Sequence, residues 1–189
     1  MKQIQLPTTA MDVVQLSVGE KVSISGVIFT LRENVHRYVQ EGNQIPAQLH
    51  GSFIYHCGPD VRKKGKKWVV NSAPPDLSAP MDSYTGDIFG RYKVRGIIGR
   101  GGMGPKTLAA CKRYATCYLT TFGGAGLALA RRIKEVRENY LRNQFDGPDA
   151  VWELEVENFP AVVTIDAHGR NLLDIVKDVS SRRFVNLHD

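Results

Sequence analysis

The sequence lacks the long apolar segments that mark membrane-spanning and exported proteins. None of its apolar runs reaches the roughly 18 residues that a membrane-spanning helix needs. The N-terminal stretch, MKQIQLPTTAMDVVQ, has no apolar core of the kind found in signal peptides. We therefore expect a cytoplasmic protein that does not bind membranes.

Cysteine is also scarce. Cys57, Cys111 and Cys117 are odd in number and scattered, and no two of them have the CxxC spacing. Zinc sites and disulfide frameworks use paired, regularly spaced cysteines. The sequence therefore indicates neither kind of site, and we expect this chain to hold no metal.

Acidic residues are outnumbered by basic ones, which leaves a net charge of +6. A basic balance suits nucleic acid, an anionic substrate or an acidic partner. The basic run 62–67 is interpreted as the solvated tip of a hairpin. No series of aromatic residues for stacking single-stranded bases lies near Arg100. We therefore expect no binding to nucleic acid.

The order of the predicted elements indicates one mixed α/β domain over residues 1–189, with its loops gathered at one edge. Residues 1–18 are expected to form an extended arm. Strands are predicted at 22–30, with an interruption at Gly26, and at 51–57, 94–98, 115–121, 151–156 and 160–165. Helices are predicted at 31–42, 81–92, 105–114, 126–142 and 172–177. The longest helix depends on the spacing of Gly126, Leu129, Ile133, Val136 and Tyr140.

A glycine-rich turn separates the apolar run 94–98 from Pro105. Residues 99–104 include four glycines, too many for the interior of a helix or strand. A proline suits the first turn of a helix, where its missing N–H is not needed. Such a turn directs free N–H groups and the positive end of a helix dipole at a ligand. With the charge of Arg100, the segment predicts an anion site.

Two motifs overlap this turn. Its glycines match the G-x-G-x-x-G pattern of dinucleotide-binding proteins, but residues 116–132 contain no acidic residue to bind a ribose. The same residues match the GxxG loop of RNA-binding KH modules, but Pro105 stands where the following helix needs an apolar residue. A KH-like RNA-binding protein therefore remains a lesser alternative.

His168 lies in a glycine-flanked loop after the apolar strand 160–165. Such a loop is a common position for a catalytic histidine, so His168 is a candidate substrate-binding residue. A structural histidine held by hydrogen bonds fits the same position equally well.

Several ordered motifs together resemble the β subunit of L(+)-tartrate dehydratase and the C-terminal domain of class I fumarases. They are SGVIFTLRENVH (25–36), IYHCGPDVRKKGKKW (54–68), MDSY (81–84), IIGRGGMGP (97–105), FGGAGLALA (122–130) and AVWELEVENFPAVVTIDAHGRNL (150–172). The resemblance implies a swivelling β/β/α domain with a mixed central sheet and flanking helices. It also implies a hetero-oligomer with an α subunit that carries a [4Fe-4S] cluster, or a homodimer when the chain is isolated.

The resemblance further implies a hydro-lyase of the fumarate hydratase or tartrate dehydratase type, which reversibly removes water from a 2-hydroxy dicarboxylate. Such a reaction needs a Lewis acid for the leaving hydroxyl, a base for the neighbouring C–H and cations for the carboxylates. Arg32 matches a substrate-binding arginine of the family. Arg100 stands where the family has lysine in a GKGG turn, and Gly101 and Gly102 complete that turn.

One segment departs from the family. The family motif GPTTxxRM corresponds here to PPDLSAPM, residues 74–81. Asp76 replaces the first threonine, a position implicated in proton transfer, and Pro80 replaces an arginine that would hold a carboxylate. Asp76 and Arg100 are therefore the candidate catalytic residues. A catalytically degenerate or regulatory relative is the alternative.

Overall fold

The structure, a computed structural model, describes residues 1–185, with side chains described to residue 181. The predicted domain extends to residue 189, and residues 186–189 lie outside the described part. A mixed seven-stranded sheet has the order β1 (Lys2–Gln5), β2 (Lys21–Thr30), β3 (Phe53–Tyr55), β6 (Gly96–Gly99), β7 (Cys117–Thr120), β9 (Val151–Ile165) and β8 (Ile133–Tyr140). The mixed α/β prediction is confirmed.

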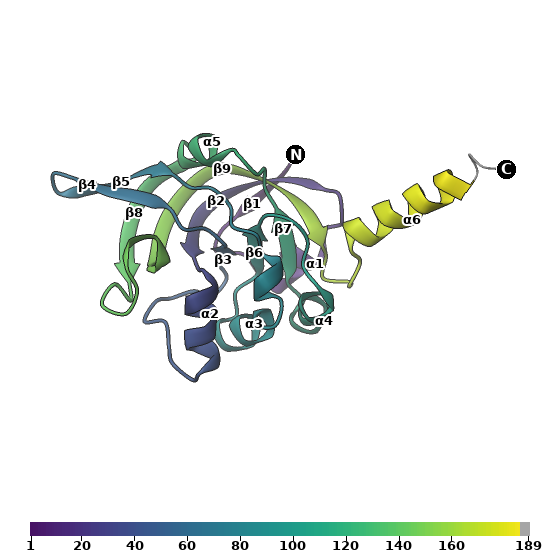
Figure 1. The fold of residues 1–189 in the computed structure, drawn as a ribbon, viewed down its shortest axis with the longest axis horizontal. Coiled ribbons are helices and arrows are strands. Elements are labelled where there is room, and N and C mark those ends of the chain that lie inside the picture. The colour runs from purple at the N-terminus through teal and green to yellow at the C-terminus, as the bar shows by residue number, and fades with distance from the viewer. Residues whose placement is uncertain (186–189) are drawn as a thin grey trace.

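An additional antiparallel pairing between β2 and β9 closes part of this sheet on itself. Strands β2, β3, β6, β7 and β9 thereby form a ring, and β1 and β8 extend it. The hairpin of β4 (Asp60–Lys64) and β5 (Lys67–Ser72) projects from one end, as predicted for the basic run (Figure 1). The alternation of residues along β9 serves this closure, because the two faces of the strand bury against different cores.

Two buried clusters hold the fold together. Inside the ring, Leu154 and Val156 of β9 join the first cluster. On the outside, Val151 and Ile165 join the second, which helices α2 (Glu33–Gln40), α3 (Thr85–Tyr92) and α4 (Pro105–Tyr114) cover (Figure 1). Each fully buried apolar side chain of this kind contributes about 1.5–3 kcal/mol.

The remaining helices are short or peripheral. They are α1 (Ala10–Val14), α5 (Gly126–Ala130), α6 (Leu172–Val185) and the 3₁₀ turns η1 (Ala79–Met81) and η2 (Gly147–Asp149). Helix α6 extends away from the sheet (Figure 1) and is longer than the predicted 172–177. Over residues 1–185, no helix combines the length and apolar character needed to cross a membrane.

The prediction of a helix over 126–142 is wrong. The observed helix α5 ends at Ala130, and residues 133–140 form strand β8, which pairs with β9. Two register shifts, after Ile133 and after Val136, each insert one extra residue in β8. Ile133 and Val136 therefore face the first core although they are three residues apart. A bulged strand thus reproduced the spacing that is typical of a helix.

The N-terminal segment is more ordered than the predicted arm. It contains α1 and strand β1, which pairs in parallel with β2. Gly26 interrupts β2 at a register shift, as predicted, and a Cβ there would lie 2.5 Å from the carbonyl oxygen of Leu6. Glycine at this position therefore lets the N-terminal segment approach the sheet closely. The predicted strands 151–156 and 160–165 are one strand, and α3 begins at Thr85, later than predicted.

Candidate active site

Three segments that are distant in the sequence meet at one edge of the sheet: the start of α2, residues 76–80 and the glycine turn after β6. The backbone of residues 76–78 runs alongside this turn like a short additional strand. Arg100 N–H donates to the carbonyl of Asp76 at 3.1 Å, and Ser78 N–H donates to the carbonyl of Arg100 at 3.0 Å. Asp76 N–H in turn donates to the carbonyl of His56, just after β3, at 2.7 Å. Asp76 and Arg100 are thereby held on adjacent backbones.

A polar pocket of about 410 Å³ opens beside these segments. Its lining consists of Arg32, Glu33, Asn34, Arg37, Asp76, Leu77, Pro80, Met81 and Asp149. The lining thus contains more acidic than basic side chains.

Arg32 lies in this pocket between two carboxylates. It is the residue just before α2, and its Nε donates to Oδ2 of Asp76 at 2.8 Å. A second guanidinium nitrogen donates to the carboxylate of Asp149, the last residue of the turn η2. A Cβ at position 58 would lie 3.0 Å from Cδ of Arg32, so Gly58 leaves room for this side chain. The charge of Arg32 is therefore already compensated within the chain.

Arg100 differs, because its side chain is exposed and has no hydrogen-bond or ion-pair partner among residues 1–181. Gly101 has a φ of +75°, which favours glycine, and a Cβ there would lie 2.9 Å from Leu77. A Cβ at Gly102 would lie 2.4 Å from Leu173. Because Gly101 and Gly102 have no side chains, the backbone of the turn can lie close to Leu77 and Leu173. The turn presents Arg100 on this closely packed backbone.

The expectation that the start of α4 binds an external anion is wrong. The carboxylate of Asp82 already accepts hydrogen bonds from the N–H groups of Lys106 at 3.3 Å and Thr107 at 3.0 Å. A Cβ at Gly104 would lie 2.6 Å from an oxygen of Asp82, so this glycine leaves room for the carboxylate. The positive end of the helix dipole is therefore satisfied from within the chain.

Comparisons with known proteins show the family of the chain. The family model described as Fumarase C-terminus matches residues 1–176. The chain belongs to this family. The chain is 32% identical over 184 residues to the L(+)-tartrate dehydratase subunit beta of Escherichia coli, covering 96% of this chain and 91% of the relative.

Two other relatives are provisionally named. A Methanocaldococcus jannaschii protein, named as a beta subunit of L(+)-tartrate dehydratase, is 35% identical over 173 residues and 89% of each chain. A Geobacillus stearothermophilus protein, named as a class I fumarate hydratase, is 39% identical over 178 residues, covering 94% of this chain. The match spans only 34% of that hydratase. Because these relatives are named as dehydratases and a hydratase, the chain is a member of a hydro-lyase family.

His168 does not join the other predicted site residues of this Fumarase C-terminus family member. Its ring Nε2 is 2.9 Å from the carbonyl oxygen of Val14, and its backbone N–H donates to Asp166. His168 is exposed and does not line the pocket of Arg32 and Asp76. The structure therefore shows a histidine held by hydrogen bonds to α1 and to its own loop.

The cysteines of this chain do not fit an iron–sulfur cluster. Cys57, Cys111 and Cys117 are all buried, and burial raises the pKa of each thiol, that of Cys111 to about 12. Cluster ligands are thiolates, so a raised pKa opposes that role. Among the described residues, no three His, Cys, Asp or Glu side chains are grouped as for a metal ion.

Sequence reasoning missed two features of the site. Asp149 contacts Arg32 across 117 positions of sequence, and no local motif points to it. His36 and His56 lie together, completely buried, beneath the pocket. Their positions gave some signal, since His36 is one helical turn after Arg32 and His56 directly follows a buried strand.

Proposed function

We propose that this chain is the β subunit of a hydro-lyase that reversibly removes water from a 2-hydroxy dicarboxylate. Its partner would be an α subunit that holds a [4Fe-4S] cluster. The observation that carries the proposal is Arg100, which has no ionic partner among residues 1–181 and is presented on the glycine turn next to the backbone of Asp76. Arginine suits a substrate carboxylate because its planar guanidinium forms two parallel hydrogen bonds with it.

Each site residue then has a role in this proposal. Arg100 binds a carboxylate of the substrate, with Gly101 and Gly102 keeping the turn close to its neighbours. Asp76 acts as the base that takes the C–H proton, and its Oδ1 has no hydrogen-bond partner among residues 1–181. Arg32 orients Asp76 through the bond to its other oxygen.

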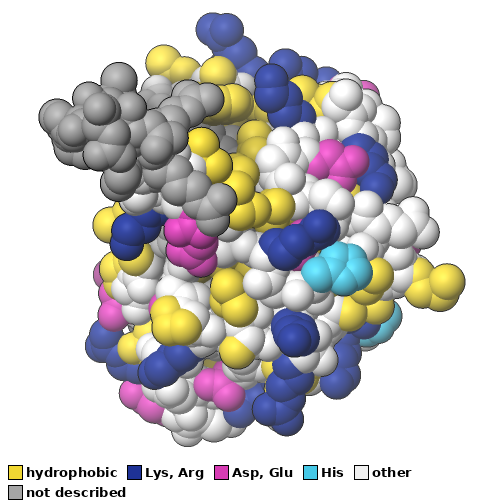
Figure 2. All heavy atoms as spheres, turned by 90° about the vertical axis from the view of Figure 1, so that its right-hand side faces the viewer, with side chains coloured by type: hydrophobic (Ala, Val, Ile, Leu, Met, Phe, Trp, Pro, Cys, Tyr) yellow, Lys and Arg dark blue, Asp and Glu magenta, His cyan; other side chains and the backbone are white. Residues whose placement is uncertain are grey.

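Exposed apolar side chains around the turn support a partner subunit. Leu77 is 50% exposed, Phe122 63% and Leu173 47%. Leu77 and Leu173 lie against Gly101 and Gly102, and Phe122 precedes Gly123, which lies against Arg100. Figure 2 views the side from which α6 projects and shows hydrophobic side chains gathered next to cationic ones. A partner that covers this surface would bury apolar area and exclude water from Arg100.

A second candidate is a relative that braces its partner without taking part in the reaction. The observation that favours it is the engagement of Arg32 by two carboxylates, together with Pro80 in place of the family arginine. Both changes reduce the positive charge available to a dicarboxylate.

The test is to produce the chain alone and together with a cluster-bearing α subunit encoded beside it. The chain alone should be colourless and should neither hydrate fumarate nor dehydrate malate or tartrate. The purified complex should be brown and should convert at least one of these acids. Brown, active protein from this chain alone would contradict the proposal, and so would a brown complex inactive on all three acids.

A further inference from the structure

A row of buried polar side chains lies behind the three segments of the site. His36, His56 and Ser78 are completely buried. The Nε2 atoms of His36 and His56 are 3.1 Å apart, and Nδ1 of His56 is 2.8 Å from Oγ of Ser78. Burial lowers the pKa of both histidines, that of His36 to about 3, so both rings are neutral at pH 7. Each neutral ring carries one N–H, so each contact joins one donor to one acceptor.

Tyr118 and Ser78 both contact the glycine turn. The hydroxyl of Tyr118 is 2.9 Å from the carbonyl oxygen of Gly101, which can only accept, so the phenol donates. The backbone N–H of Ser78 donates to the carbonyl of Arg100 at 3.0 Å. Ser78 therefore links the two histidines to the glycine turn.

The histidine end of the row determines the direction of these hydrogen bonds. Nδ1 of His36 is buried and has no hydrogen-bond partner among the described residues. If His56 donated to His36, this Nδ1 would carry an N–H with no acceptor. Buried N–H groups without an acceptor are rarer in proteins than buried acceptors without a donor. His36 therefore donates from Nε2, and its Nδ1 keeps only a lone pair. His56 accepts at Nε2, so its proton is on Nδ1 and is donated to Oγ of Ser78.

We propose that His36, His56 and Ser78 form one directional hydrogen-bond chain that positions the site. The chain begins four residues after Arg32 and ends at Ser78, two residues after Asp76. The backbone N–H of Ser78 connects it to the carbonyl of Arg100. Glycine at position 99 is part of this arrangement, because a Cβ there would lie 1.9 Å from Oγ of Ser78.

The three residues are positioning residues, because they are completely buried and reach the site through the backbone of Ser78. That the linked segments form an active site depends on the function proposed above, whereas the direction of the hydrogen bonds does not.

Nitrogen NMR of the histidine rings in the isolated, ¹⁵N-labelled chain at pH 7 tests the direction. His56 should be protonated on Nδ1 only and His36 on Nε2 only. His56 protonated on Nε2, or either ring doubly protonated, would overturn the proposal. This measurement needs neither a partner subunit nor activity, so it succeeds or fails separately from the proposed function.

Ser78→Ala tests the positioning, with Ser52→Ala as the matched control. Ser52 is also buried, and its hydroxyl donates to the carbonyl of Leu49 at 2.6 Å, outside the chain of hydrogen bonds. Only Ser78→Ala should shift the backbone amide signals of residues 100–102 and release His56 from its single tautomer. In the complex with an α subunit, only Ser78→Ala should lower kcat/KM. Equal responses of the two variants would contradict the positioning role.

Discussion

Arg32 and Arg100 belong to neighbouring segments of the site, but their charges are available to different degrees. Arg32, at the start of α2, is half-buried and forms ion pairs with Asp76 and Asp149. Arg100, on the glycine turn, is exposed and has no ionic partner within residues 1–181. A substrate carboxylate must compete with two carboxylates for Arg32, whereas Arg100 can bind it directly.

A sequence motif therefore identifies a cationic residue, but it does not show whether the charge of that residue is free to bind a ligand. The family resemblance implies a substrate-binding role for both arginines, although the family has lysine at the position of Arg100. At Arg32, however, the replacement of threonine by Asp76 adds a candidate base and an ionic partner at once. The start of α2 therefore positions Asp76, and under the proposed function the glycine turn would supply the cation that binds the substrate.

Asp76→Asn tests the start of α2 and should have the largest effect. If Asp76 is the base, kcat of the complex should fall about 100-fold or more, because general bases contribute about 10²–10⁴-fold. Steady-state kinetics measure the loss, and urea unfolding shows whether the fold is intact. Asp149→Asn is the control, since it removes the other partner of Arg32 but leaves the base. Equal, near-normal kcat in both variants would exclude Asp76 as the base.

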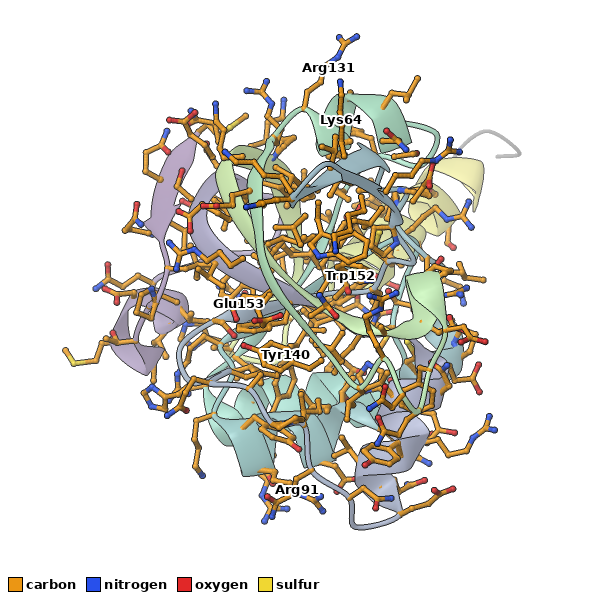
Figure 3. All side chains as sticks on the ribbon, turned by 90° about the vertical axis from the view of Figure 1, so that its left-hand side faces the viewer. Lys64, Arg91, Arg131, Tyr140, Trp152 and Glu153 are labelled. Atoms are coloured by element: carbon orange, nitrogen blue, oxygen red, sulfur yellow. The ribbon has the colours of Figure 1, made fainter. Side chains whose placement is uncertain are left out.

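Arg100→Ala tests the glycine turn. Loss of a charged hydrogen bond to the substrate should lower kcat/KM by about ten- to a hundredfold. Arg100→Lys should retain more activity than alanine, although it loses the planar fork. Arg131→Ala is the control, because Arg131 is also exposed and its side chain points away from the fold (Figure 3). Normal turnover in both Arg100→Ala and Asp76→Asn would mean that this subunit only braces its partner.

Local signals predicted much of the fold. Helix α4 was predicted at 105–114 and has these bounds, because Gly104, Pro105 and the left-handed Ala115 limit it from both sides. Strand β8 was not predicted, because its two bulges depend on pairing with β9. The closure of the ring through β2 and β9 was likewise invisible, since alternation along a strand does not reveal its partner.

The site was predictable only in part, for the same reason. The resemblance pointed to Arg32, Asp76 and Arg100, whose segments meet in the structure. Asp149 and Asp82 could not be found, because their contacts join residues 117 and 25 positions apart. Their carboxylates nevertheless determine which positive groups of the site are free to bind a substrate. Asp149 pairs with Arg32, and Asp82 occupies N–H groups at the start of α4. The roles of the site residues stay predictions until the variants are measured.

Acid should weaken the hydrogen-bonded layer beneath both regions. His36 and His56 have lowered pKa values in the fold, so they stay neutral there while the unfolded chain takes up protons below about pH 6.5. Their contribution to stability is therefore complete above pH 6.5 and is lost as the pH falls toward about 3, the pKa of His36. The expected loss is about 1.4 kcal/mol per pH unit for each histidine.

Urea unfolding at pH 7, 6 and 5 measures this loss. The window lies above the range in which Asp12 and Glu157, whose pKa values are lowered, take up protons. The exposed His50 supplies the control, since His50→Asn should leave the slope unchanged. A free energy of unfolding that is flat from pH 7 to pH 5 would show that the buried rings can be protonated in the fold.

Asp82→Ala concerns the helix side of the glycine turn and should have the smallest effect. Its carboxylate accepts from the N–H groups of Lys106 and Thr107, in place of a capping side chain at Gly104. The loss of such a cap costs about 1 kcal/mol, so the urea midpoint should fall slightly and the amide of Thr107 should exchange faster. Asp87→Ala is the control, because Asp87 is exposed and has no side-chain hydrogen bond within the described residues. If Asp82→Ala also gave the start of α4 a measurable affinity for phosphate or a dicarboxylate, the internal carboxylate would be what keeps this helix end from competing with Arg100. Unchanged stability and exchange would mean that water replaces the cap.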